Sequence, residues 1–249
     1  IILLFGDSWF FYFTPGIGNL ANRFLDFGKG QAMDFVAIGE NGMEIGKPGK
    51  TNLYDLTTFF QWESKTVDMI VISGGGNDFA GADDLLPLLQ PGNPHDAASW
   101  FNQEKTDNLF GVIKAGYERV IYLRDQYAPS IPILTHCYDY SKADGQGVLW
   151  FSPWIKPSLD QIGMPANLHR EAVKLIIDRL AAIQTELAGP LYHFVDTRNT
   201  LAPADWTNEL HPTGKGFNKI ARKFHPHFAQ YFPGWVRKPG WLSDLEQED

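Results

Sequence analysis

Five short runs rich in aliphatic and β-branched residues recur along the chain, and longer amphipathic segments separate them. The runs cover residues 1–5, 34–38, 68–73, 131–136 and 192–196. Strands that alternate with helices are typical of a parallel sheet covered by helices on both faces. The alternation therefore predicts one α/β domain over residues 1–249, a length sufficient to bury a substantial core.

The longer segments carry apolar residues at steps of three and four, as helices with one buried face do. The clearest of them cover residues 109–121, 168–187 and 217–224. Pro226 cannot donate a backbone hydrogen bond, so we expect the last helix to end or kink there. From about residue 233 the periodicity fades, and the remaining tail is predicted to be coil packed on the surface.

Two connections are much longer than the usual length of roughly 4 to 6 residues. They cover residues 79–105 and 138–166, and each follows the carboxyl end of a predicted strand. In open parallel sheets, ligands bind outside that edge. These two segments are therefore predicted to be functional loops.

Charge and composition narrow the possible partners. The net charge of −8 and the isoelectric point near 5.3, without a basic cluster, argue against nucleic acid as a partner. No run of 18 apolar residues occurs, so we expect no transmembrane segment and a soluble protein. The compartment, cytoplasmic or exported, stays open because a signal preceding Ile1 would not be visible in this sequence. The oligomeric state stays open as well.

The first apolar run continues into Gly6, Asp7 and Ser8, and two interpretations of this serine are open. A glycine at the end of a strand permits a sharp turn, which would leave Ser8 at the carboxyl edge of the sheet. A serine hydroxyl becomes a nucleophile only with a base and with donors for the developing oxyanion. Without those partners, Ser8 is an ordinary turn residue.

Glycine-containing stretches follow the next two strands. The third strand leads into "GGGND", where the side-chain amide of Asn77 could donate to an oxyanion at the same sheet edge. The stretch after the third strand does not continue into the Gly-Lys-Ser or Gly-Lys-Thr of a nucleotide-binding loop, and the first strand lacks a dinucleotide fingerprint. We therefore expect no nucleotide cofactor.

A candidate base follows the last strand, in "ELHPTGKG". The unperturbed pKa of histidine is about 6.5, which suits a general base, and Pro212 and Thr213 restrict the turn that presents His211. His225 and His227 lie two residues apart, but no carboxylate or cysteine spacing completes a metal site around them. The sequence predicts a metal-free site.

These four stretches occur in order over nearly the whole chain, and together they resemble the SGNH hydrolases, also called the GDSL esterase and lipase family. The matching blocks are "GDS" at 6–8, the glycine of "ENG" at 42, "GGND" at 75–78 and "LHPTGKG" at 210–216. The resemblance implies a flavodoxin-like three-layer α/β/α sandwich with a five-stranded parallel sheet. It also implies hydrolysis of a small-molecule acyl ester without a cofactor.

Carried over by position, the resemblance assigns Ser8 as the nucleophile and His211 as the general base. The backbone N–H groups of Ser8 and Gly42 and the side chain of Asn77 would form the oxyanion hole. Gly39 is a competing choice for the glycine donor. Gly42 is preferred because it lies where the block glycine falls relative to the strand.

One position departs from the family pattern. The family places an aspartate three residues before the histidine, where this chain has Asn208. An asparagine carbonyl can orient the imidazole of His211, but it lacks the charge that stabilises an imidazolium. Three accounts are open: Asn208 orients the base, Glu209 or Asp205 approaches it instead, or the site is weakened or inactive. Asn208 is the favoured orienting residue.

Aromatic residues supply candidate walls for a substrate pocket, because ligand sites are mostly apolar. Trp150, Phe151 and Trp154 lie in the second long loop, and Trp9 follows the proposed nucleophile; packing onto the body of the protein is an equally good interpretation. The favoured activity is hydrolysis of a modest acyl ester. Two alternatives are an acyltransferase with the same serine intermediate and a catalytically weakened binder of a small molecule or anion.

Overall fold

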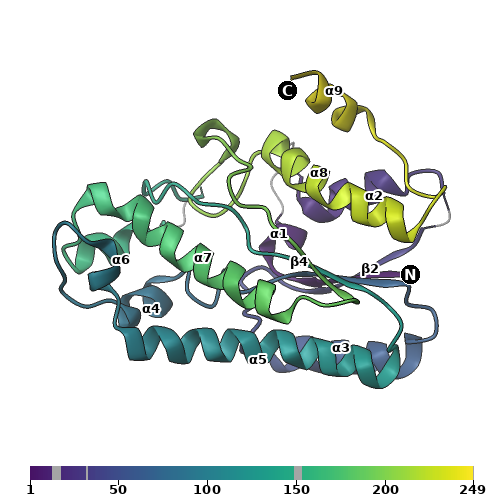
Figure 1. The fold of residues 1–249 in the computed structure, drawn as a ribbon, viewed down its shortest axis with the longest axis horizontal. Helices are drawn as coiled ribbons and strands as arrows, with labels where there is room; N and C mark the ends of the chain where they lie inside the picture. The colour runs from purple at the N-terminus through teal and green to yellow at the C-terminus, as the bar shows by residue number, and fades with distance from the viewer. Residues whose placement is uncertain (13–17, 32, 149–152, 249) are drawn as a thin grey trace.

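The computed structural model describes residues 1–12, 18–31, 33–148 and 153–248. A central sheet lies between two layers of helices (Figure 1). The predicted three-layer α/β/α architecture is confirmed. Within the described residues, no helix combines the length and the hydropathy that a bilayer crossing requires.

The sheet contains five parallel strands in the order β2-β1-β3-β4-β5. This order is that of flavodoxin-like folds. Each strand lies within two residues of the run predicted from sequence. The strands are β1 (Ile2–Gly6), β2 (Phe35–Gly39), β3 (Met69–Ser73), β4 (Ile133–His136) and β5 (Tyr192–Val195).

The central strands β1 and β3 are buried along their whole length, which explains their uninterrupted apolar sequences. Gly6, the last residue of β1, pairs with Gly39 on one side and with Ser73 on the other. The carboxyl ends of three strands therefore meet at Gly6, one residue before Asp7 and two before Ser8.

Two groups of helices cover the sheet (Figure 1). Helices α2 (Leu20–Phe27) and α8 (Gly214–Tyr231) pack together on one face. On the other face α5 (Gln103–Tyr127) contacts both α3 (Lys50–Glu63) and α7 (His169–Leu187). The apolar periodicity predicted α5, α7 and α8, and each of these helices buries that face.

Of the two outcomes expected at Pro226, an end or a kink, the end is wrong: helix α8 continues to Tyr231. Phe224 and Phe228, two residues before and two residues after the proline, are buried. Both rings lie 5.1 Å from the ring of Phe24, between centroids. Aromatic packing of this kind favours continuing the helix despite the hydrogen bond that proline cannot donate.

The coil predicted after residue 233 contains a helix, α9 (Gly240–Glu248), so this part of the tail is a correction. Leu242 and Leu245 are buried, and the indole Nε1 of Trp241 donates to the carboxylate of Asp26 at 3.0 Å. The helix packs against α8. Its apolar pattern covers only two turns, too few for periodicity to detect reliably.

The two long connections contain short helical turns rather than continuous coil. The first holds α4 (Ala82–Leu85), η1 (Leu86–Leu88) and η2 (Ala97–Trp100), and the second holds α6 (Lys156–Gln161) and η3 (Ala166–Leu168). Two more short turns lie at the carboxyl edge of the sheet: α1 (Ser8–Phe11) and η4 (Pro203–Asp205).

Candidate active site

Ser8 lies at a sharp turn from strand β1 into helix α1. Asp7 caps the helix, because its side chain accepts a hydrogen bond from the backbone N–H of Trp9 at 3.0 Å. A Cβ at Gly6 would lie 2.3 Å from the carbonyl oxygen of Ser73, so only glycine fits there. As the first residue of the helix, Ser8 has a backbone N–H without an acceptor inside the helix.

His211 lies next to Ser8, and 2.9 Å separates its Nε2 from the Ser8 Oγ. The backbone around the histidine is closed by a hydrogen bond from the Thr207 N–H to the His211 carbonyl, 2.9 Å long. The imidazole is buried, and this loss of hydration lowers the pKa of His211 to about 3. His211 is therefore neutral near pH 7 and able to accept a proton.

Asn208 holds the other side of the imidazole. Its Oδ1 lies 3.1 Å from His211 Nδ1 and also accepts the backbone N–H groups of Leu210 and His211, each at 2.9 Å. An acceptor facing Nδ1 places the proton on that nitrogen and leaves Nε2 free to accept from Ser8. The amide is fully buried, and its Nδ2 donates to the hydroxyl of Tyr12 at 3.1 Å.

The two carboxylates considered as alternative partners of His211 bind elsewhere. Asp205 accepts from the Lys219 ammonium at 2.6 Å and from the backbone N–H of Ala202 at 2.8 Å. Glu209 is fully buried and points toward the second long loop. Its two oxygens accept four backbone N–H groups at 2.7–3.1 Å, from Gly145, Trp154, Ile155 and Lys156.

Asn77 lies beside the nucleophile, at the carboxyl end of β3. Its Nδ2 donates to the carbonyl of Met43 at 3.2 Å and to the Asp7 carboxylate at 3.4 Å. Gly42 precedes Met43 in the turn after β2 and has a φ of 82°, in the left-handed region that favours glycine. The structure thus brings Asn77 and the Gly42 turn to the same sheet edge.

Position 39, the competing choice for the glycine donor, requires glycine for a different structural reason. A Cβ there would lie 1.9 Å from the carbonyl oxygen of Gly6. Gly39 therefore permits the close pairing of β2 with β1. This steric requirement is sufficient to account for glycine at the position.

Sequence reasoning missed the network beneath Ser8. The buried Asp7 carboxylate accepts from the hydroxyls of Ser73 at 2.8 Å and Tyr138 at 2.5 Å, in addition to the Trp9 N–H. Burial raises the pKa of Asp7 to about 6, and these hydrogen bonds oppose the rise. Tyr138 follows β4 at the same edge of the sheet. Its position just after a predicted strand is a sequence signal that could have indicated its contact with Asp7.

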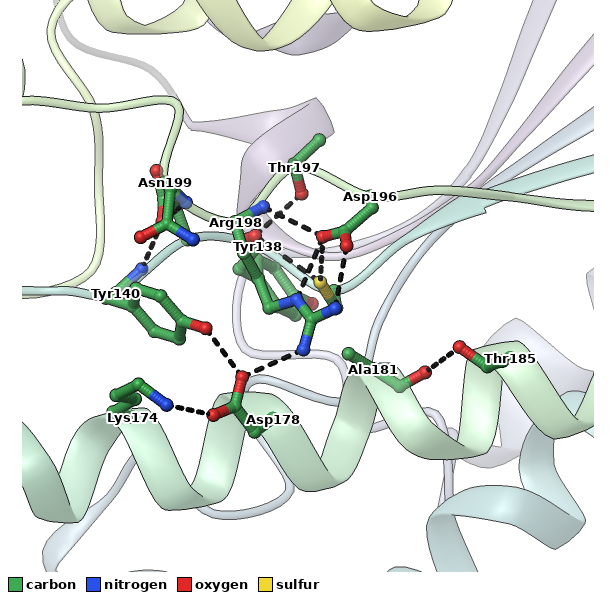
Figure 2. A network of polar contacts seen from close by, with 12 residues as sticks. Tyr138, Tyr140, Lys174, Asp178, Ala181, Thr185, Asp196, Thr197, Arg198 and Asn199 are labelled. Atoms are coloured by element: carbon green, nitrogen blue, oxygen red, sulfur yellow. Dashed lines mark hydrogen bonds and ion pairs between the residues drawn. The ribbon is translucent and has the colours of Figure 1, made fainter.

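Tyr138 adopts a φ of 63°, which is uncommon for a residue other than glycine. Its backbone N–H donates to His136 Nδ1 at 3.1 Å. Its carbonyl accepts the Thr197 hydroxyl at 2.6 Å, a bond drawn in Figure 2. These two bonds fix the ring beneath the site, where its hydroxyl also accepts the N–H of Gly76 at 3.2 Å.

A second group of contacts ties the segments after β4 and β5 to helix α7 (Figure 2). Asp178 on α7 accepts from the Tyr140 hydroxyl at 2.6 Å and from the Arg198 guanidinium at 2.8 Å. Asp139 accepts the backbone N–H groups of residues 199–201 at 2.7–2.8 Å. Both segments, which border the sheet edge that carries Ser8, are therefore held in place by hydrogen bonds.

A cavity of about 50 Å³ opens beside the proposed nucleophile. Ser8, Trp9 and Asn77 line one side of it. Trp154 instead contacts the His211 ring, 5.8 Å away between centroids and nearly perpendicular. Trp150 and Phe151, the other predicted pocket residues, lie outside the described residues. The remaining wall is largely apolar and includes Phe79, Ala80, Leu85, Ile155, Val173, Ile176, Ile177, Trp206 and Leu210.

Comparison with solved structures supports the fold. A lipase from goat rumen metagenome has a TM-score of 0.53 and 13% identity, with 90% of this chain and 95% of that chain covered. A carbohydrate esterase family 3 protein from Talaromyces cellulolyticus has a TM-score of 0.52 and 11% identity, with 92% and 96% covered. An extracellular lipase from Streptomyces rimosus has a TM-score of 0.50 and 16% identity, with 100% and 99% covered.

A search of curated proteins found no match. The profile of the GDSL-like Lipase/Acylhydrolase family, in contrast, matches residues 2–224. That range contains the Ser8 turn, Asn77 and His211, the residues on which the resemblance was based. The chain therefore belongs to the GDSL-like lipase and acylhydrolase family and is a carboxylic ester hydrolase.

Proposed function

We propose that the chain hydrolyses short-chain acyl esters through an acyl intermediate on Ser8. The observation that carries this proposal is the 2.9 Å separation between Ser8 Oγ and a neutral, buried imidazole. His211 Nε2 takes the hydroxyl proton as Ser8 Oγ attacks the ester carbonyl, and the tetrahedral intermediate collapses when that proton passes to the leaving alcohol. A water molecule, deprotonated by the same nitrogen, then attacks the acyl-enzyme. The proton passes from Nε2 to Ser8 Oγ as the bond to the acyl group breaks, which releases the acid and restores the serine.

The oxyanion formed in each step would accept from the N–H groups of Ser8 and Gly42 and from Asn77 Nδ2. Asn77 Nδ2 has two hydrogens, and both have acceptors, Met43 at 3.2 Å and Asp7 at 3.4 Å. The bond to Asp7 is the longer and weaker one. We propose that the oxyanion replaces Asp7 as the acceptor while the bond to Met43 keeps the amide in place.

The cavity beside Ser8 supports a small acyl group. An apolar cavity of roughly 150 Å³ holds a benzene ring. The volume here, about 50 Å³, is a third of that, which is room for roughly two to four carbon atoms. Acetyl to butyryl esters are therefore the proposed substrates, and the alcohol portion would extend toward solvent.

The test uses p-nitrophenyl esters of increasing acyl length with the wild type, Ser8→Ala and Ser130→Ala. Ser130 is an exposed serine far along the chain and serves as a matched control. We expect kcat/KM to peak between two and four carbons, to fall by more than about 1,000-fold in Ser8→Ala, and to be unchanged in Ser130→Ala. Equal turnover by the wild type and Ser8→Ala would refute the assignment of the nucleophile.

An acyltransferase would use the same intermediate and remains the second candidate. It differs only in the acceptor that attacks the acyl-enzyme. Adding a small alcohol or a sugar to the assay separates the two activities, because a transferase forms a new ester at the expense of free acid. A hydrolase releases free acid in proportion to p-nitrophenol at every acceptor concentration.

A further inference from the structure

The ring of Tyr12 lies flat against the imidazole of His211. The ring centroids are 3.8 Å apart, and the planes differ by 7°. Tyr12 directly follows α1, and its backbone N–H donates to the carbonyl of Ser8 at 2.6 Å. One short turn of chain therefore carries both the proposed nucleophile and a ring that covers the proposed base.

Hydrogen bonds hold Tyr12 at both ends. Its hydroxyl accepts the Nδ2 hydrogen of the buried Asn208, at 3.1 Å. Its backbone carbonyl accepts from the side chain of Asn19, the residue that caps helix α2, at 3.3 Å. The stacked position is thus fixed by groups on two other segments as well as by contact with the imidazole.

The surroundings of His211 explain why such a ring matters. An imidazolium forms when His211 takes a proton, and Asn208 carries no charge to balance it. The titratable groups nearby are committed to other partners: Glu209 to four backbone N–H groups, Asp205 to Lys219, and Asp7 to Ser73 and Tyr138. The face of an aromatic ring attracts a cation within about 6 Å of its centroid.

We propose that Tyr12 is a positioning residue for the base: its ring face stabilises the His211 imidazolium in place of the missing carboxylate, and its hydroxyl accepts the buried amide of Asn208. This inference rests on the proposed function, because the imidazolium forms only if His211 removes the proton of Ser8. It assigns a role in the reaction to a residue outside the four motif blocks.

Four variants separate the ring from the hydroxyl and from packing. Tyr12→Phe keeps the ring, whereas Tyr12→Leu removes it, and Phe11→Leu is a matched control on the neighbouring residue. Tyr12→Met fills the space with a flexible side chain without a π face and serves if the leucine variant does not fold. We expect kcat to fall about 3-fold to 30-fold in Tyr12→Leu and Tyr12→Met, with KM little changed, and to change less in Tyr12→Phe.

The direct test is to measure the pKa of His211 by NMR, in the covalent adduct that each variant forms with an organophosphonate. The tetrahedral phosphonyl group on Ser8 imitates the charged intermediate. Loss of the ring should lower this pKa by about 0.5 to 1.5, because the cation loses a favourable contact. A purely packing role predicts the opposite sign, since water that enters in place of the ring would stabilise the cation.

A second measurement repeats the ring deletion in an Asn208→Asp background. A carboxylate at position 208 neutralises the imidazolium by itself, so Tyr12→Leu should cost less than about threefold there. An equal loss in both backgrounds, or an unchanged or raised pKa in the adduct, would overturn the role of Tyr12 alone. Absence of any adduct on Ser8 would overturn the proposed function and the inference together.

Discussion

The two sides of the proposed catalytic pair differ in where negative charge is placed. Beneath Ser8, the buried carboxylate of Asp7 accepts hydrogen bonds from side chains at the ends of two other strands. Beside His211, the residue in contact with the base is the neutral Asn208, while the adjacent Glu209 faces away and binds loop backbone. The carboxylate nearest to His211 in sequence, that of Glu209, thus holds the second long loop and does not orient the base.

The difference shows how two adjacent positions can divide tasks that one carboxylate often combines. Asn208 Oδ1 needs only a lone pair to fix the imidazole tautomer. Four converging backbone N–H groups, by contrast, form strong bonds only with an ionised acceptor. The predictions below test each side of this division.

Among substitutions outside the proposed Ser8–His211 pair, Asn77→Ala should have the largest effect on catalysis. Removing one oxyanion donor typically lowers kcat by about 100-fold to 1,000-fold. Asn77 also contacts Asp7, so this variant tests the Ser8 side of the comparison. Steady-state kinetics on p-nitrophenyl acetate measure the loss, and circular dichroism confirms that the fold is retained. A loss below about tenfold would remove Asn77 from the oxyanion hole.

Glu209→Gln should act on stability more than on chemistry. The substitution removes the charge and turns an amide NH₂ toward backbone donors, which leaves at least one buried group unsatisfied. We expect the free energy of unfolding to fall by about 3 kcal/mol, measured by urea denaturation. A variant of normal stability without activity would instead mean that Glu209 acts on His211.

Asp7→Asn should change how stability depends on pH. The folded-state pKa of Asp7 is raised to about 6, so its contribution is fully present below the unfolded value of 3.8 and is lost as pH rises through 6. Relative to the wild type, Asp7→Asn should therefore gain up to about 3 kcal/mol between pH 4 and pH 7. Parallel stability curves over this range would show that Asp7 titrates normally.

Ile176→Ala should have the smallest effect on turnover and should act mainly on specificity. Ile176 lines the cavity beside Ser8 and also a separate cavity of about 130 Å³ toward Phe110 and Arg179. Shortening it should move the preferred acyl length up by about two carbons, because the two spaces would join. The ratio of kcat/KM for hexanoate to acetate esters measures the shift, with the exposed Leu25→Ala as control. An unchanged ratio would place the acyl group elsewhere.

The strands could be predicted from the sequence because they are short, nearly continuous apolar runs, and most large helices because their apolar periods are long and regular. The common location of Ser8, Asn77 and His211 could be predicted because each follows a strand, at the edge where a parallel sheet brings its loops together. The direction in which Glu209 points could not, since it depends on a loop more than fifty residues earlier in the chain. The stacking of Tyr12 on His211 could not be predicted either, because the two residues are far apart in the sequence. Tyr12 also lies in a run of aromatic residues that equally suits a core.

The central claim is that an uncharged Asn208 orients the base, and the value of kcat/KM for Asn208→Ala tests it most directly. Without Oδ1, the Nδ1 proton loses its acceptor, and the tautomer that accepts from Ser8 is no longer favoured. The account predicts a loss of at least about 100-fold, with Asn208→Asp at or above wild-type activity. Full activity in Asn208→Ala would contradict it.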